Sequence, residues 1–257
     1  MIKRASQDCS LDVGTESHVQ LMAKMLVADN ALIDIDRAKR KGFVEVIFAQ
    51  GKKVQDIIRI FECSIDAGSL AVATRVSDEQ AENLLERFAS DGAWFPDARV
   101  FIANKSAIPA EPYPTTIGIL TAGLTDRGAA EEAAQLLAAA HYPIERVFDV
   151  GVAGLHRLLV SLERIKKCDA VIVAAGMEGA LPTVVAGLIE QPVIALPTSV
   201  GYGISQNGTT ALHSMLASCS PGIAVVNIDN GYGAAMMAHA ICNRIHKGVR
   251  SQKEEAL

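Results

Sequence analysis

Aromatic residues, long apolar runs and paired cysteines are all scarce in this chain of 257 residues. Only 5% of the residues are aromatic, although 50% are hydrophobic. Because aliphatic side chains dominate, the composition favours parallel sheets buried beneath helices over an antiparallel sandwich. Charges or turn residues interrupt every apolar run before it reaches about 18 residues, which excludes a membrane-spanning helix.

Basic charge is not in excess either. The chain has 24 basic and 29 acidic residues, which gives a net charge of −5. No overall field would attract it to nucleic acid or to an anionic membrane, so we expect neither as a partner. One basic cluster, Arg37-Ala-Lys-Arg-Lys41, is interpreted either as a solvated helix end or as a phosphate contact.

The cysteines show no Cys-x-x-Cys pair that would indicate zinc or a redox dithiol. They are odd in number and widely spaced, at positions 9, 63, 168, 219 and 242. We interpret them as free thiols in a reducing compartment. The basic start Met-Ile-Lys-Arg is not followed by an apolar signal segment. The sequence therefore predicts a soluble, cytoplasmic protein.

Predicted strands and helices alternate along two segments that a proline-rich stretch separates. Three prolines in Ile108-Pro-Ala-Glu-Pro-Tyr-Pro114 exclude both a helix and a central strand there. We therefore expect a small N-terminal α/β domain over residues 1–110 and a catalytic domain over residues 115–250. The first should contain strands over 43–48, 69–75 and 98–103, with helices over 54–61 and 78–89.

The second domain has the more regular alternation. Apolar runs predict strands over 116–120, 146–150, 170–175, 192–196 and 223–228, and helices over 125–140, 155–165, 207–218 and 234–246. Continuously apolar strands are typical of sheets that are buried on both faces. Five strand–helix units predict an α/β fold with a doubly wound parallel sheet of the flavodoxin or Rossmann type. Ligands of such folds bind at the carboxyl ends of the strands.

Polar residues follow the predicted strands at that edge. Asp126 opens a helix, where it could cap the helix and also hold a ribose hydroxyl or a phosphate-bound cation. His156 and Arg157 open the next helix and could pair with a phosphate or a carboxylate. Glu178 lies between two glycines after an apolar strand, a position suited to binding a metal ion or moving a proton.

Two further motifs leave their chemistry open. Cys219 follows a predicted helix, as either a small buried hydrophobe or a thiol that a cation or a positively charged substrate must activate. Gly201-Tyr-Gly203, with Gly208, is an imperfect dinucleotide fingerprint. Because the chain contains no Walker loop and no Gly-x-Ser-x-Gly elbow, kinase and α/β-hydrolase functions lack support.

Four segments together resemble a known fold, that of the purine-pathway aminoimidazole ribonucleotide carboxylases and mutases. They are Thr121-Ala-Gly-Leu-Thr-Asp126, Gly154-Leu-His-Arg157, Gly176-Met-Glu-Gly-Ala-Leu-Pro182 and Asn227-Ile-Asp-Asn-Gly-Tyr-Gly-Ala234. They resemble more closely the LarB family, the pyridinium-3,5-biscarboxylic acid mononucleotide synthases of nickel-pincer nucleotide biosynthesis. That resemblance extends to the N-terminal domain, which the purine enzymes lack, through Asp34-Ile-Asp-Arg37, Gly42-Phe-Val-Glu-Val-Ile47 and Gly51-Lys52. The purine enzymes also have a histidine in place of Ala180 and no equivalent of Glu178.

The resemblance implies carboxylation of nicotinic acid adenine dinucleotide at ring carbon 5, followed by phosphoanhydride hydrolysis that releases AMP. A thiolate that adds at ring carbon 4 makes carbon 5 nucleophilic, which explains the need for a cysteine. Cys219 matches the family's catalytic cysteine, and Glu178 and Asp34 match its acidic positions. The two carboxylates are interpreted as proton-transfer groups or as ligands of Mg²⁺. The co-substrate is carbon dioxide or bicarbonate.

The resemblance also implies a binding site and an assembly. The expected substrate-binding residues are Thr121, Gly123, Thr125, Asp126, His156, Arg157, Gly176, Met177, Gly179, Arg37 and Lys52. A homo-octamer or another homo-oligomer is expected. About the first 25 residues match the family poorly, so no site residue is taken from them. Two alternative functions remain: a purine-pathway carboxylase or mutase, and a non-catalytic nucleotide-binding module.

Overall fold

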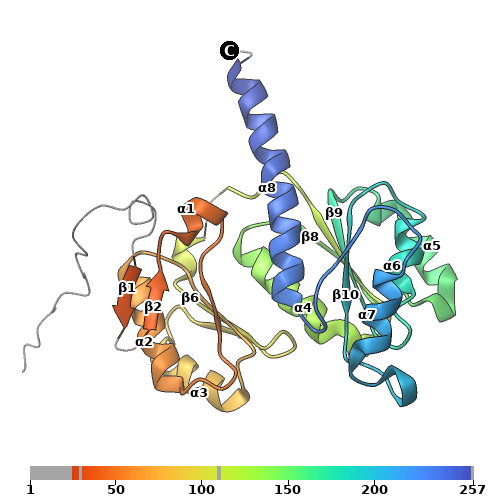
Figure 1. Ribbon diagram of the computed structural model, residues 1–257. Coiled ribbons are helices and arrows are strands. Elements are labelled where there is room, and N and C mark those ends of the chain that lie inside the picture. Colours follow the sequence, from red (N-terminus) through yellow and green to blue (C-terminus); the bar gives the residue numbers. More distant parts are fainter. Residues whose placement is uncertain (1–24, 29–30, 109–110, 256–257) are drawn as a thin grey trace, which may run out of the picture. The chain divides into compact units, whose positions relative to one another are not determined.

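A computed structural model describes residues 25–28, 31–108 and 111–255 of the protein (Figure 1). The chain forms two compact units. The first runs to Trp94 and resumes at Val100–Ile108, whereas Phe95–Arg99 belong to the second unit with the chain from Pro109 onward. Within the described residues, no helix has both the length and the apolar character that crossing a membrane requires.

The first unit contains a mixed four-stranded sheet and a hairpin. The sheet has the order β3-β4-β6-β5, in which β3 is parallel to β4 and β4 is antiparallel to β6. The hairpin pairs β1 with β2. The strands are β1 (Met25–Ala28), β2 (Ala31–Asp34), β3 (Val46–Phe48), β4 (Ala71–Thr74), β5 (Ala93–Phe95) and β6 (Val100–Ala103). The helices are α1 (Arg37–Lys41), α2 (Val54–Asp66), α3 (Asp78–Arg87) and the 3₁₀ turn η2 (Lys105–Ala107).

The core of the first unit lies between the sheet and helices α2 and α3. Phe61 of α2 packs at 6.0 Å from Phe101 of β6, measured between ring centroids, and both rings are fully buried. A capping box of Ser77 and Gln80 begins α3. The Ser77 hydroxyl oxygen accepts the Gln80 backbone N–H, and the Gln80 side-chain oxygen accepts the Ser77 backbone N–H. Helix α3 then buries Leu84 in the same cluster.

The second unit is built on a five-stranded, all-parallel sheet of order β11-β10-β9-β7-β8. Counted along the chain, this is the order 5-4-3-1-2, a doubly wound sheet of the flavodoxin type. The strands are β7 (Ile117–Thr121), β8 (Ile144–Val147), β9 (Ala170–Ala175), β10 (Val193–Pro197) and β11 (Ile223–Val225). The α-helices are α4 (Arg127–Ala139), α5 (Leu155–Ile165), α6 (Leu181–Ala186), α7 (Thr209–Leu216) and α8 (Gly231–Glu255). Three 3₁₀ turns follow strands: η3 (Leu124–Asp126), η4 (Val152–Gly154) and η5 (Gly203–Gly208).

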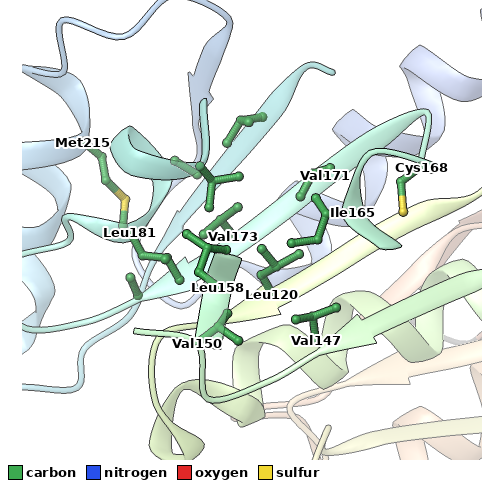
Figure 2. Close-up of a cluster of buried hydrophobic side chains, with 14 of the residues drawn as sticks. Leu120, Val147, Val150, Leu158, Ile165, Cys168, Val171, Val173, Leu181 and Met215 are labelled. Atoms are coloured by element: carbon green, nitrogen blue, oxygen red, sulfur yellow. The ribbon is translucent and has the colours of Figure 1, made fainter. Parts of the chain in front are cut away.

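Helices α5, α6 and α7 share one buried cluster with alternate residues of the sheet. Figure 2 shows Leu120, Val171 and Val173 of the strands among Leu158, Leu181 and Met215 of the three helices. Helices α4 and α8 pack on each other and on β9. Because successive residues of a strand point to opposite faces, Ile119 and Ile172 fill the other face, where they are fully buried. Each such side chain contributes about 1.5–3 kcal/mol through burial.

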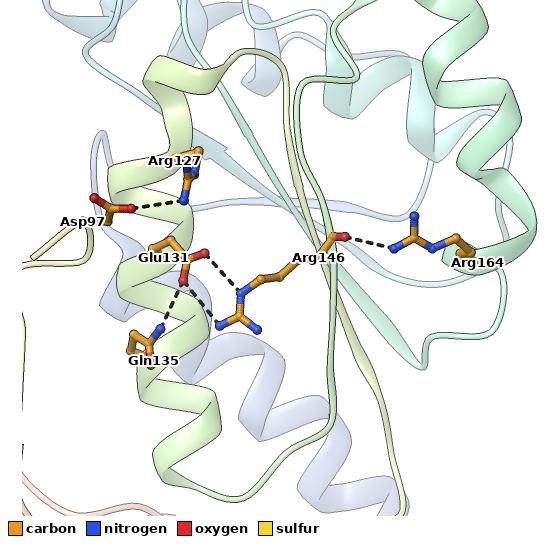
Figure 3. A network of polar contacts seen from close by, with 6 residues as sticks. All are labelled: Asp97, Arg127, Glu131, Gln135, Arg146 and Arg164. Atoms are coloured by element: carbon orange, nitrogen blue, oxygen red, sulfur yellow. Dashed lines mark hydrogen bonds and ion pairs between the residues drawn. The ribbon is translucent and has the colours of Figure 1, made fainter. Parts of the chain in front are cut away.

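A polar network fixes helix α4 to its neighbours (Figure 3). Arg127 Nη2 donates to Asp97 Oδ2 over 3.1 Å at the start of the helix. Arg146 Nε of β8 donates to Glu131 Oε1 over 3.2 Å, one turn further along. Arg146 is therefore paired with a side chain of α4 and serves the fold. The start of α4, which follows Asp126, is held in place by the contact between Arg127 and Asp97.

The predicted doubly wound parallel sheet is confirmed. Strand β9 has the predicted bounds, residues 170–175, and the other strands of the second unit differ from prediction by a few residues at their ends. Strand β11 ends at Val225 rather than at residue 228, because the chain turns at Asn227–Asn230 to begin α8.

Candidate functional site

The carboxyl ends of the parallel strands surround a pocket of about 230 Å³ in the second unit. Turns after β7, β8, β9 and β10 supply its walls, as expected for a doubly wound sheet. It is lined by Ala122, Gly123, Thr125, Asp126, Gly151, Val152, Ala153, Arg157, Ala175, Gly176, Met177, Glu178, Ala180, Leu181 and Val200. Of these described residues, Arg157 is the only cation, and Asp126 and Glu178 are the only carboxylates.

Asp126 lines the pocket and is 4% exposed. Its Oδ2 accepts the Gly123 N–H over 2.8 Å, and its Oδ1 accepts the Thr198 hydroxyl over 2.6 Å. Burial raises the pKa of this carboxyl above its usual value, while the hydrogen bonds from Thr198 and from the backbone of Gly123 and Gly176 oppose the rise. Asp126 thus joins the turns after three strands, β7, β9 and β10.

Arg157 is held at the pocket wall by an ion pair with Asp149. Asp149 has a φ of +59°, a left-handed conformation that aspartate tolerates better than most residues, and its N–H donates to Thr121 Oγ1 over 3.1 Å. The guanidinium lies over Gly154, where an added Cβ would be only 2.8 Å from Arg157 Nε. A guanidinium in this position is suited to a phosphate or a carboxylate, with which it can form two parallel hydrogen bonds.

Glu178 projects from the tight turn between β9 and α6 and is exposed. Met177 and Gly179 on either side of it both have a positive φ, of +54° and +65°. A Cβ on Gly179 would lie 2.8 Å from the Ala211 carbonyl oxygen, so only glycine fits the close approach to α7. The turn therefore fixes the backbone of Glu178 while its carboxylate stays open to a ligand.

Cys219 is exposed and does not line the pocket in the single chain. It lies in the loop between α7 and β11, which is attached to helix α6. The Thr183 hydroxyl donates to Ser218 Oγ over 2.8 Å, and the Ser220 hydroxyl donates to the Thr183 carbonyl oxygen over 2.9 Å. Cys168 and Cys242 are buried instead, and burial raises the pKa of each thiol to about 11. Cys9 lies outside the described residues.

The remaining predicted site residues, Asp34, Arg37 and Lys52, belong to the first unit. Asp34 Oδ2 pairs with Arg37 and Arg40, and the hydrogen bond with Arg40 is the main cause that holds the pKa of this carboxyl below its usual value. Asp34 Oδ1 is buried and has no hydrogen-bond partner among the described residues. Lys52 Nζ is exposed and donates to the Phe48 carbonyl oxygen over 2.8 Å.

The pocket gathers most of the residues that the sequence suggested for the second domain. Among those that line it are Gly123, Thr125, Asp126, Arg157, Gly176, Met177 and Glu178. Thr121, His156 and Gly179 do not line it: Thr121 is fully buried and accepts the Asp149 N–H, and His156 is exposed on α5. Asp149 and Thr198, which hold Arg157 and Asp126, were missed: Asp149 falls within the strand predicted over residues 146–150, and Thr198 lies two residues after the strand predicted over residues 192–196.

The pocket can bind an anionic group at Arg157 and a hydroxyl at Asp126, while Glu178 is free to move a proton. No group of three or more histidine, cysteine, aspartate or glutamate side chains that could hold a metal ion occurs in the described parts of the chain. A single exposed carboxylate such as Glu178 still fits Mg²⁺, which usually keeps several waters and is held by one or two carboxylates together with substrate phosphates.

Comparison with known proteins assigns both units to families. Residues 25–105 match the LarB/PurE-like N-terminal domain, and residues 116–256 match AIR carboxylase. The chain is 39% identical over 250 residues to the uncharacterized protein MJ0165 of Methanocaldococcus jannaschii, covering 93% of this chain and 94% of that protein. It is 37% identical over 127 residues to the N5-carboxyaminoimidazole ribonucleotide mutase of the same organism, covering 48% of this chain and 75% of the mutase.

Among solved structures, a crystal structure of a Treponema denticola PurE2 variant matches at 22% identity and a TM-score of 0.38, over 55% of this chain and 94% of that one. The AIR carboxylase match relates the second unit to carboxylases and mutases, which makes this chain an enzyme of that related class. The chain belongs to the LarB family, with a LarB/PurE-like N-terminal domain followed by an AIR carboxylase domain.

Proposed function

We propose that the protein carboxylates nicotinic acid adenine dinucleotide at pyridinium carbon 5 and hydrolyses its phosphoanhydride, giving pyridinium-3,5-biscarboxylic acid mononucleotide and AMP for nickel-pincer nucleotide biosynthesis. The observation that carries the proposal is the exposed Cys219 thiol, attached through Thr183 to helix α6. The same helix begins at the pocket wall, next to Glu178.

The proposed chemistry uses the thiolate to reverse the polarity of the ring. The Cys219 sulfur forms a bond to ring carbon 4, and the electron pair moves to the ring nitrogen. Carbon 5 of the resulting dihydropyridine then attacks carbon dioxide and forms the new carboxylate. Loss of the carbon 5 proton, followed by departure of the thiolate, restores the aromatic pyridinium. We assign the proton transfer to Glu178, and to Asp34 as the second acidic group.

Hydrolysis adds one water across the phosphoanhydride and leaves one phosphate on each mononucleotide. Arg157 is the proposed partner of a phosphate or of the ring carboxylate, and Arg37 and Lys52 are further proposed phosphate contacts. Mg²⁺ held by Glu178 would supply charge neutralisation on the phosphates. The protein's own contribution to this step is to orient the phosphates through Arg157 and the N–H groups of the strand-end turns.

A homo-oligomer is the proposed working form. Its volume of about 230 Å³ is below the roughly 300–1,000 Å³ of typical small-molecule sites, so it accommodates one part of a dinucleotide. Cys219 is not among the lining residues of the single chain. We therefore expect an assembled form, a homo-octamer or a smaller homo-oligomer, to complete the site.

The experiment is mass spectrometry of products after incubation with nicotinic acid adenine dinucleotide, ¹³C-bicarbonate and Mg²⁺. The expected products are AMP and a mononucleotide that carries one ¹³C-carboxylate. Cys219→Ala should form neither the labelled product nor an adduct, whereas Cys63→Ala, a half-buried cysteine of the first unit, should retain activity. Full activity of the Cys219→Ala protein would overturn the mechanism.

A second candidate is the purine-pathway mutase reaction, which the 37% identity to the N5-carboxyaminoimidazole ribonucleotide mutase favours. The presence of Ala180 at the pocket wall, where the purine enzymes have a histidine, counts against it. Turnover of N5-carboxyaminoimidazole ribonucleotide, with the dinucleotide left unchanged, would select this candidate. Saturable binding of the dinucleotide without any product would instead indicate a non-catalytic module.

A further inference from the structure

The residue that follows β10, Thr198, is almost fully buried, with 1% of its surface exposed. Its hydroxyl donates to Asp126 Oδ1 over 2.6 Å, a short bond to a carboxylate. We propose that Thr198 is a positioning residue, whose hydrogen bond holds the Asp126 carboxylate in the orientation in which it accepts a substrate hydroxyl. The proposal rests on the proposed function in one respect, that the ligand of the pocket is a nucleotide.

The Asp126 carboxylate is held from three sides. Its Oδ2 accepts the Gly123 N–H over 2.8 Å, and the backbone of Gly176 supplies a further hydrogen bond. Thr198 is the only side-chain donor to this carboxylate among the described residues. Without the hydroxyl, Oδ1 would be a buried oxygen with one donor fewer, and the carboxylate could rotate away from the pocket.

Thr198 is itself fixed by the end of β9 and by the turn η5. Its N–H donates to the Ala175 carbonyl oxygen over 3.1 Å. A Cβ on Gly176 would lie 2.7 Å from Thr198 Oγ1, and a Cβ on Gly208 would lie 2.6 Å from the Thr198 carbonyl oxygen. Glycine at both positions leaves room for the threonine and keeps its hydroxyl directed at Asp126.

Other charges near Asp126 do not replace this bond. Asp229, which precedes α8, is the charged side chain that acts on Asp126, and it disfavours the ionised carboxylate. Arg157 and Glu178 line the same pocket, and the guanidinium of Arg157 is paired with Asp149. The Thr198 hydroxyl is thus the side-chain contact that favours an ionised, oriented Asp126.

Binding measurements on the full-length protein test the proposal. Thr198→Val keeps the shape of the side chain and removes the donor, whereas Thr198→Ser keeps the donor. Isothermal titration with nicotinic acid adenine dinucleotide should show a dissociation constant about tenfold higher for the valine variant and near the wild-type value for the serine variant. Thr115→Val is the matched control, a buried threonine that precedes the amino end of β7, and it should bind normally.

A double-mutant cycle tests whether the loss of binding in Thr198→Val acts through Asp126. In an Asp126→Ala background, Thr198→Val should weaken binding by less than about twofold further, because the acceptor of the Thr198 hydroxyl is already absent. Equal binding by wild type and Thr198→Val, or an undiminished effect in the Asp126→Ala background, would overturn the proposal. Should Thr198→Val fail to fold, Thr198→Cys, a weaker donor, is the second variant, and normal binding by it would count against the proposal.

A readout that needs no ligand separates this proposal from the proposed function. The carboxyl ¹³C resonance of Asp126, assigned through Asp126→Asn, should titrate at higher pH in Thr198→Val than in wild type or Thr198→Ser. If wild type neither binds nor converts the dinucleotide, the proposed function fails, and an unmoved titration would then overturn the role of Thr198 as well. A moved titration with unchanged dinucleotide binding would show a bond that serves the fold alone, which also overturns the positioning role.

Discussion

The Thr183 hydroxyl lies 2.8 Å from the Ser218 hydroxyl, and this contact attaches the Cys219 loop to helix α6. On the other side of the cysteine, Ser220 donates to the Thr183 carbonyl oxygen over 2.9 Å. One residue of α6 therefore anchors both neighbours of Cys219. Because α6 begins at Leu181 in the pocket wall, the helix links the pocket to the cysteine loop.

Removing the Thr183 hydroxyl should loosen this loop without unfolding the protein. In Thr183→Val the amides of residues 218–220 are expected to exchange with deuterium faster than in wild type, because one of the two side-chain anchors is lost. The rate of product formation should fall about three- to tenfold, the loss expected for one hydrogen bond. Thr183→Ser should restore both, and an unchanged exchange rate in Thr183→Val would contradict the anchoring role.

The cysteines should differ sharply in their reaction with iodoacetamide. Cys219 is exposed, whereas Cys168 and Cys242 are buried with their thiol pKa values raised to about 11. Since the thiolate is the reacting form, we expect Cys219 to be alkylated at pH 8 while the two buried cysteines stay unmodified. Peptide mass spectrometry after brief labelling checks this. Labelling of Cys168 or Cys242 in the folded protein at the rate of Cys219 would contradict the structure.

Much of this architecture was predictable because the second unit follows simple periodic rules. Strand β9 is continuously apolar over Ala170–Ala175, and its length and burial were read directly from that run. The short helix α6 was not predicted, because six residues that include Pro182 give too little periodicity to recognise. The β1–β2 hairpin was missed for a similar reason: its two strands contain four residues each.

The site was predictable at the level of turns but not of supporting contacts. Asp126 and Glu178 were identified because each follows a strand end, where ligands of this fold bind. Thr198 and Asp149 were not, since their importance depends on which distant side chain they meet, Asp126 in one case and Arg157 in the other. The single chain also leaves Cys219 outside the pocket, a fact that no sequence pattern indicates.

Arg157 should be hard to replace, even by another cation. In Arg157→Lys the planar pair of donors is lost and the ion pair with Asp149 changes geometry, so KM for the dinucleotide should rise about tenfold while kcat changes little. Asp149→Asn keeps an acceptor and tolerates the positive φ, so its KM should rise less, about threefold. Steady-state kinetics on both variants checks this order. A normal KM for Arg157→Lys would exclude a bidentate contact.

Gly176 and Gly187 offer a paired test of the pocket's backbone. A Cβ at Gly176 would lie 2.2 Å from the Val200 carbonyl oxygen, so the turns after β9 and β10 must separate in Gly176→Ala. This overpacking should lower the free energy of unfolding by about 1–3 kcal/mol and weaken dinucleotide binding. At Gly187, which ends α6 with a φ of −76°, the nearest atom would be 3.5 Å away, and alanine should be tolerated. Thermal unfolding checks the pair, and equal melting temperatures for Gly176→Ala and wild type would show that the two turns are less tightly packed than the structure indicates.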